Sequence, residues 1–187
     1  FSSVSALGHS EGALIAALAG ADGRADALVS IAGPGEPIGD ILRRQLSERL
    51  PGPMQPDAFA LLDSLAAGRL VPEPPGLLAQ VFPPAMQPFV ISWMAQDPAR
   101  ALAAFAGPVL IVQGTTDFQV LVSDAEALAA ADADARLVLI EGMNHVLKDD
   151  AGDAAAQMAG SYMDPSRPLN AELVRETAAF LLAAPRR

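Results

Sequence analysis

The sequence predicts an α/β protein with a parallel sheet of about four strands, flanked by helices and interrupted by a helical insertion. Three observations lead to this fold class. Residues 1–33 read as strand, helix and strand; residues 34–107 are rich in proline and contain helical patterns but no clear strand; residues 108–187 return to alternating strands and helices. We therefore expect a core built from residues 1–33 and 108–187 and a cap formed by residues 34–107.

The first zone has the pattern of a parallel strand–helix–strand unit. Two short apolar runs, Val4–Leu7 and Ala27–Ala32, flank a stretch of Ala, Leu and Ile at Ala13–Ala21. Gly20 and Gly23 are expected to end the helix between the strands. The second run is almost continuously apolar, which is typical of a strand that is buried on both faces.

The middle zone predicts helices at Ile38–Arg49, at Ala58–Ala67 and at about Gln87–Met94, separated by prolines. Because these segments carry apolar positions of their own, we expect a folded cap. The alternative is a loosely ordered surface insertion.

The third zone begins with a β-branched strand, Val109–Val112, after Pro108. A helix is expected from about Asp124, where Ser123 and Glu126 have the spacing of a capping box. The next strand is predicted at Arg136–Ile140.

The last predicted helix covers about Ala171–Ala183, with Asn170 as its N-cap. Helical spacing places Val174, Ala178 and Leu181 on one face, which we expect to pack against the core.

Composition excludes several classes of function. The chain has 22 acidic and 12 basic residues and a net charge of −10, which argues against nucleic acid and anionic membrane surfaces as partners. It has no cysteine and two histidines, so a disulfide framework, a thiol nucleophile and a multi-histidine metal site are not expected. No membrane span or signal peptide is visible, and a cytoplasmic location is the default expectation.

One motif carries chemistry. Gly8-His9-Ser10-Glu11-Gly12 follows a predicted strand and precedes a predicted helix, which is the context of a G-x-S-x-G nucleophile elbow. Such a serine sits on a sharp, strained turn that lifts its hydroxyl clear of the sheet. Glycine is expected at both flanking positions because strand and helix approach closely there. Ser10 is the candidate nucleophile.

A serine nucleophile needs a general base and an orienting carboxylate. His9 is expected to point away from the Ser10 hydroxyl, which leaves His145 in the loop after the last strand. Asp117 follows the Val109–Val112 strand. Parallel strands end at the same edge of a sheet, so these loops should meet at Ser10. Asp124 is the rival carboxylate, but its place in the first turn of a helix explains it without catalysis.

Two further acidic residues, Asp149 and Asp150, follow the histidine closely. We expect both to be solvated.

With these motifs, the sequence resembles the α/β-hydrolases, in particular the serine aminopeptidase-like and esterase-like branch that carries a helical cap. The resemblance rests on Gly8–Gly12, Gly114–Asp117, Gly142–Lys148 and the closing helix. It implies that Ser10 attacks an ester carbonyl, that His145 transfers the proton and that Asp117 holds the imidazolium. The backbone N–H of Glu11 would supply one oxyanion-hole donor, and no cofactor is implied.

The chain departs from this family at its start. Only nine residues precede Ser10, whereas the family's preceding four strands would need on the order of 75 residues. The N-terminal half of the usual fold, with the second oxyanion donor, is therefore expected to be absent. Activity is expected to be weak unless a partner supplies that donor. The Val4–Leu7 strand should expose an edge and pair with a second copy, giving a homo-oligomer such as a dimer.

Substrate-pocket candidates are the apolar residues Met86, Phe89 and Trp93 of the cap, together with Val146 beside the base. The three cap residues share one helical face, which either packs the cap on the core or contacts substrate. If they contact substrate, a small to medium apolar acyl group fits best.

The sequence thus predicts a serine hydrolase of small-molecule carboxylic esters that acts through an acyl-enzyme. Thioester, amide and C–C bond hydrolysis would leave a similar sequence pattern. A hydrolase fragment with little or no activity, which self-associates, is the alternative from a different class.

Overall fold

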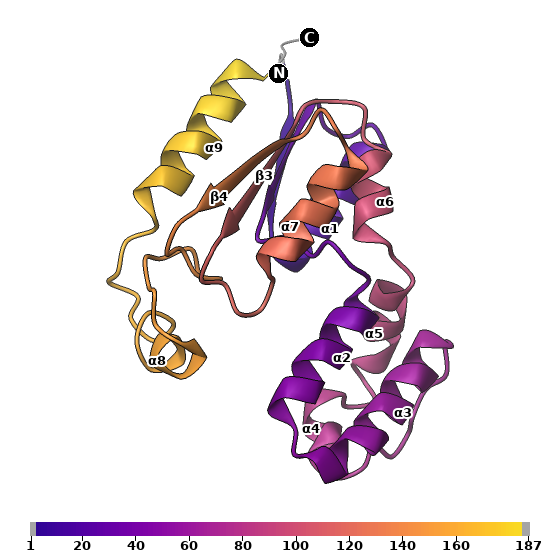
Figure 1. The fold of residues 1–187 in the computed structure, drawn as a ribbon. Helices are drawn as coiled ribbons and strands as arrows, with labels where there is room; N and C mark the ends of the chain where they lie inside the picture. Colours follow the sequence, from indigo (N-terminus) through magenta and orange to yellow (C-terminus); the bar gives the residue numbers. More distant parts are fainter. Residues whose placement is uncertain (1–2, 185–187) are drawn as a thin grey trace. The chain divides into compact units, whose positions relative to one another are not determined.

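A four-stranded parallel sheet organises the protein (Figure 1). The computed structural model describes residues 3–184. The strands lie in the order β1 (Ser5–His9), β2 (Ala27–Ile31), β3 (Val109–Gly114) and β4 (Arg136–Ile140). All three pairings are parallel, so the four carboxyl ends share one edge. The predicted α/β fold with about four strands is confirmed.

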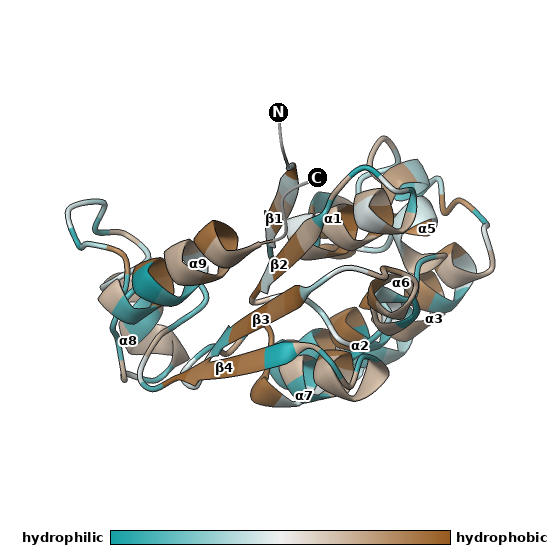
Figure 2. Ribbon diagram, turned by 90° about the horizontal axis from the view of Figure 1, so that it is seen from above, coloured by the Kyte–Doolittle hydropathy of each residue, from teal (hydrophilic) through white to brown (hydrophobic). Residues whose placement is uncertain are grey.

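Helices cover both faces of this sheet (Figure 2). The helices in this part of the chain are α1 (Glu11–Ala21), α6 (Pro98–Ala103), α7 (Val122–Ala131), α8 (Ala154–Ala159) and α9 (Ala171–Ala183). Helices α1, α6 and α7 lie on one face, and α9 lies on the other. Within residues 3–184, no helix combines the length and the apolar character needed to cross a bilayer.

The core follows from the alternation of side chains along β2 and β3. Because successive residues of a strand face opposite sides, Val29 and Leu110 point to the α9 face. Both have no exposed surface, and Leu173 of α9 closes the cluster around them. The other face of these central strands is covered too, which explains their continuous apolar sequence.

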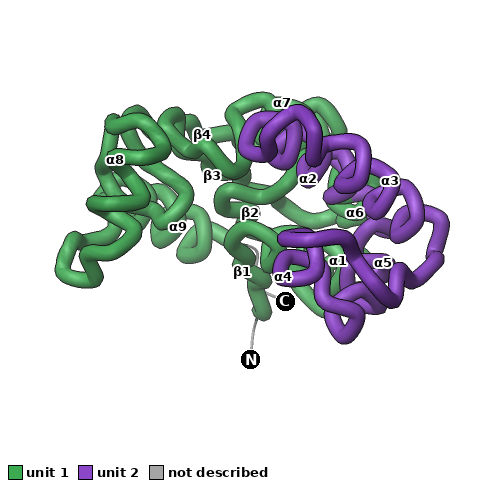
Figure 3. Tube along the Cα trace, turned by 90° about the horizontal axis from the view of Figure 1, so that it is seen from below, with its two compact units in different colours: residues 1–35, 98–187 green, residues 36–97 purple. Residues whose placement is uncertain are grey.

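The chain divides into two compact units (Figure 3). The first contains the sheet and the helices above, and the second is Glu36–Asp97. Its helices are α2 (Ile38–Arg49), the 3₁₀ turn Gly52–Met54, α3 (Gln55–Ala66), α4 (Leu78–Val81) and α5 (Gln87–Met94). It has its own core, in which Leu62 and Leu65 of α3 pack with Phe82 and Val90. A separate core is what a folded unit requires.

The start of α7 differs from the sequence prediction. Neither Ser123 nor Glu126 forms the expected capping box. The helix begins at Val122, and the Asp124 carboxylate accepts the Leu121 N–H at 2.9 Å. The serine and glutamate have the right spacing, but the helix starts two residues earlier than predicted, so the acid at its third position caps it.

The buried face of α9 also differs. Asn170 is the N-cap as predicted, and its side-chain oxygen accepts the Leu173 N–H at 2.9 Å. However, Val174 is 53% exposed and Leu173 only 3%. The buried stripe thus runs through Leu173 and the partly buried Phe180 and Leu181. Because Leu173 and Val174 are adjacent and both apolar, the sequence allowed either one to face the core. The packing in the structure buries Leu173.

Candidate active site

Ser10 sits on a strained turn between β1 and α1. Its φ of 56° and ψ of −124° are unusual for a residue with a side chain. The turn is held in place because the Ser10 N–H donates to the Ile31 carbonyl at 2.9 Å, at the end of the neighbouring strand β2. Persistent strain of this kind requires support from its surroundings and is concentrated at functional sites.

The two flanking glycines have different roles. A Cβ on Gly8 would lie 1.9 Å from the Gly12 carbonyl oxygen, so strand and helix can approach only because residue 8 has no side chain. A Cβ on Gly12 would meet no atom within 4 Å. The expectation that both positions require glycine on steric grounds is therefore wrong for Gly12.

Asp117 lies in the loop after β3, and its side chain has no exposed surface. Its Oδ1 accepts the N–H groups of Gln119 at 2.8 Å and Val120 at 3.0 Å. Its Oδ2 lies 2.8 Å from Nδ1 of His145. The backbone bonds fix one carboxylate oxygen and leave the other directed at the imidazole.

His145 lies in the loop after β4 and is buried, with 7% exposure. Its Nε2 is 3.2 Å from Oγ of Ser10. Since Nδ1 faces a carboxylate, the hydrogen-bond network assigns the ring proton to Nδ1 and leaves the Nε2 lone pair for the serine hydroxyl. The structure thus brings Ser10, His145 and Asp117 together, as the chain order and the parallel sheet predicted.

Close packing joins the loops that carry the acid and the base. A Cβ on Gly114 would lie 2.0 Å from the Met143 carbonyl oxygen, so Gly114 permits the approach of these loops. The Thr116 N–H donates to the same carbonyl at 3.2 Å, and the Gly142 N–H donates to Thr115 Oγ1 at 2.9 Å. These contacts set the distance between the Asp117 and His145 loops.

Sequence reasoning missed the role of His9. Its Nε2 donates to the His145 carbonyl at 2.8 Å, and the two rings are 4.9 Å apart. Burial, followed by the electrostatic influence of His145, lowers the pKa of His9 from 6.5. Nothing in the local sequence reveals this contact, because it joins residues 136 positions apart.

The remaining predicted site residues are placed as follows. Glu11 is the first residue of α1, so its N–H is one of the helix's four N-terminal donors without an intrahelical acceptor. Val146 is half-buried beside His145. Met86, Phe89 and Trp93 belong to the second unit, where Met86 and Phe89 are exposed and the Phe89 and Trp93 rings lie 5.7 Å apart. Their contact with substrate stays a prediction.

The other acidic candidates have structural partners. Besides capping α7, Asp124 accepts the Gly35 N–H at 3.1 Å. Asp149 is exposed and accepts from the Asn170 amide at 2.5 Å. Asp150 is not fully solvated as expected, since it is half-buried and its oxygens accept from the Gly152 N–H and the Arg167 guanidinium. Among residues 3–184, no cluster of three potential metal ligands occurs.

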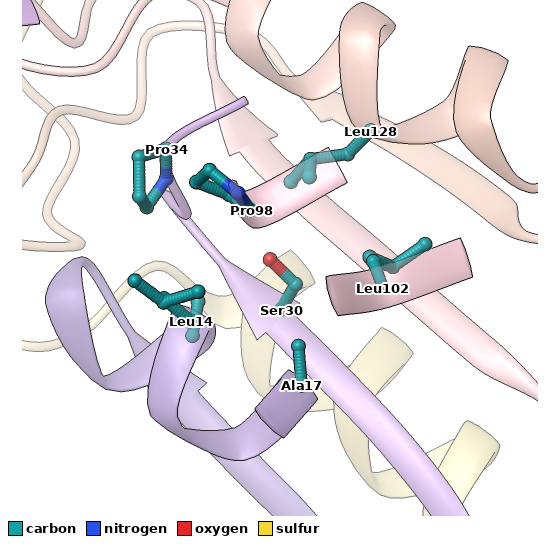
Figure 4. A pocket seen from close by; sticks show the side chains of 8 residues that line it. Leu14, Ala17, Ser30, Pro34, Pro98, Leu102 and Leu128 are labelled. Atoms are coloured by element: carbon teal, nitrogen blue, oxygen red, sulfur yellow. The ribbon is translucent and has the colours of Figure 1, made fainter. Parts of the chain in front are cut away.

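A small cavity lies between β2 and the helices α1, α6 and α7, and it is not lined by Ser10, His145 or Asp117 (Figure 4). Its interior of about 10 Å³ is sufficient for one water molecule. The lining is Ala13, Leu14, Ala17, Ser30, Pro34, Pro98, Leu102 and Leu128. The buried Ser30 hydroxyl has no hydrogen-bond partner among the described residues. This cavity is too small for an acyl group.

Solved structures with a similar fold include two from Mycobacterium tuberculosis. One, described as a non-heme bromoperoxidase named BpoC, matches with a TM-score of 0.51 and 14% identity over 95% of this chain and 66% of that chain. The other, Rv0554, matches with a TM-score of 0.51 and 13% identity over 97% of this chain and 66% of that chain. An enol-lactonase from Burkholderia xenovorans has a TM-score of 0.47 and 16% identity, with 94% and 64% coverage.

The likeness to the two Mycobacterium tuberculosis structures shows that the chain has the α/β-hydrolase fold. The chain spans slightly less than two thirds of the length of these structures. No protein-family model matches the sequence, and no curated protein matches it.

Proposed function

We propose that this chain, which has the α/β-hydrolase fold, is a serine hydrolase that cleaves carboxylic esters with small to medium acyl groups. One observation carries the proposal: a continuous line of contacts from Ser10 Oγ through His145 to Asp117, with distances of 3.2 and 2.8 Å. A serine, a base and an orienting acid within hydrogen-bond reach are the arrangement that nucleophilic acyl transfer requires.

In the first half-reaction, Nε2 of His145 takes the Ser10 proton while Oγ forms a bond to the ester carbonyl carbon. Asp117 keeps the ring in the tautomer that can accept this proton and stabilises the imidazolium that results. The tetrahedral intermediate collapses when the bond to the leaving oxygen breaks. His145 gives its proton to that oxygen, the alcohol departs, and Ser10 remains acylated.

In the second half-reaction, a water molecule attacks the acyl carbon as His145 removes its proton. The ester bond to Oγ breaks, Oγ recovers a proton from His145, and the carboxylic acid is released. The Glu11 N–H at the start of α1 would donate to the oxyanion in both steps. One such donor contributes about 3–4 kcal/mol of transition-state stabilisation.

The preference for an apolar acyl group is supported by Val146, an uncharged side chain that directly follows His145 in the sequence. Contact of Met86, Phe89 or Trp93 of the second unit with the acyl group is part of the proposal. A serine–histidine–aspartate arrangement also suits thioesters and amides, so a substrate series must distinguish these reactions. Matched p-nitrophenyl esters of increasing acyl length, one thioester and one anilide would rank them by kcat/KM.

The decisive test is intact-mass spectrometry of the purified chain before and after treatment with a fluorophosphonate. We expect one adduct per chain, which Ser10→Ala removes and Ser47→Ala retains. Ser47 is a matched control because its exposed hydroxyl only donates to the Arg44 carbonyl of its own helix. A folded chain that forms no adduct, or an adduct that survives Ser10→Ala, would overturn the proposal.

A further inference from the structure

Gln113 is a fully buried polar residue at the site-facing end of β3. It has no exposed surface, and it follows the four apolar residues Val109–Val112 of the same strand. An amide in this position loses its hydration, and that loss costs free energy unless protein groups replace the water. Its side-chain contacts therefore indicate why glutamine is present there.

The amide nitrogen of Gln113 has three oxygen neighbours. Nε2 donates to the Val120 carbonyl at 2.9 Å, to the Gly114 carbonyl at 3.2 Å and to Oδ2 of Asp117 at 3.2 Å. All three neighbours are acceptors, so they fix the orientation of the amide. Its Oε1 is buried and has no hydrogen-bond partner among the described residues.

The Asp117 contact links Gln113 to the proposed reaction. Oδ2 of Asp117 accepts from both Gln113 Nε2 and His145 Nδ1, whereas Oδ1 is held by backbone N–H groups. The Gln113 amide therefore binds the same carboxylate oxygen, Oδ2, that contacts His145. Rotation of the carboxylate away from His145 would break the Gln113 contact together with the backbone contacts.

We propose that Gln113 is a positioning residue that holds Asp117 in the orientation required by His145, an inference that rests on the proposed hydrolase function. Loss of this donor should therefore misorient the carboxylate and, with it, the imidazole that Asp117 orients.

The test compares Gln113→Met with Gln157→Met. Methionine has a shape similar to that of glutamine but has no N–H donor. Gln157 is the matched control because it is equally buried, also has an orphaned Oε1, and donates only to the backbone carbonyls of Thr116 and Gly152. We measure kcat and KM for a p-nitrophenyl ester.

For Gln113→Met we expect kcat to fall about 10- to 100-fold, by analogy with other residues that orient a catalytic group, and KM to change little. Gln157→Met should leave kcat within about threefold of the parent. Equal effects of the two variants, or a kcat for Gln113→Met equal to that of the parent, would overturn the inference.

A second readout separates this inference from the proposed function. If the parent chain hydrolyses no ester, the downfield proton resonance of His145 Nδ1–H still reports its bond to Asp117. We expect this resonance to shift or broaden in Gln113→Met and to persist in Gln157→Met. An unchanged resonance in Gln113→Met would refute the positioning role. If that variant does not fold, Gln113→Asn, which withdraws the amide by one methylene, replaces it.

Discussion

At the scale of single residues, His9 makes the stability of the folded protein depend on pH. Its pKa is lowered by burial and by the neighbouring His145, although the His145 carbonyl and Asp117 oppose that shift. Between the lowered pKa and 6.5 the unfolded chain binds more protons at this position than the folded chain. The contribution of His9 to stability is therefore present above pH 6.5 and is lost as the pH falls through this window.

We expect His9→Gln to reduce the loss of unfolding free energy between about pH 7.5 and about pH 5.5. Glutamine retains an N–H donor for the His145 carbonyl but does not titrate. Urea unfolding at the two pH values measures the difference. If both proteins lose the same stability over this interval, His9 is not responsible for the pH dependence.

Asp117→Asn tests the proton arrangement at the same scale. The new amide can present an N–H to Nδ1 of His145, which favours the ring tautomer with its proton on Nε2, facing Ser10. That tautomer cannot accept the serine proton. We expect phosphonate labelling of Ser10 to slow by about 10⁴-fold, a magnitude known for this change in a serine protease. Labelling at the parent rate would remove Asp117 from the proposed mechanism.

At the scale of elements, the packing of β1 against α1 distinguishes the two glycines of the elbow. A side chain at residue 8 meets the Gly12 carbonyl, which is backbone and cannot rotate away. We expect Gly8→Ala to lower the free energy of unfolding by about 3 kcal/mol, the upper end for overpacking. Gly12→Ala should be neutral or slightly stabilising, because alanine favours helix. Urea unfolding of both variants measures this difference in unfolding free energy. Equal stabilities would contradict the different roles of the two glycines.

At the scale of the whole molecule, the sheet has two edges, β1 and β4. Edge strands associate unless charge, irregularity or a covering element prevents it. β4 carries Arg136, paired with Glu176, whereas β1 has neither an acidic residue nor Lys or Arg and exposes 49% of Leu7. We therefore propose that β1 is the surface through which two copies pair.

Light scattering over a range of concentrations should then detect a dimer that Leu7→Lys shifts towards monomer. Leu139→Lys, on the opposite edge strand and similarly exposed at 42%, is the matched control and should not change the distribution. A monomer at every concentration would show that the β1 edge does not associate in solution.

The sequence by itself predicted the order of the four strands along the chain, and it identified Ser10, Asp117 and His145, which the structure brings together. Each of these residues follows a recognisable strand, and parallel strands place their carboxyl ends at one edge. This rule predicts that residues far apart in the sequence lie close together, even when the packing is not known.

Only the tertiary structure decided what those side chains touch. Local periodicity could not select Leu173 over Val174, because adjacent apolar residues support two helical registers. Nor could it reveal the bond of His9 to a carbonyl 136 residues away, or the buried amide of Gln113 directed at Asp117. Such contacts depend on distances between elements, and those distances are set by side-chain packing rather than by spacing along the chain.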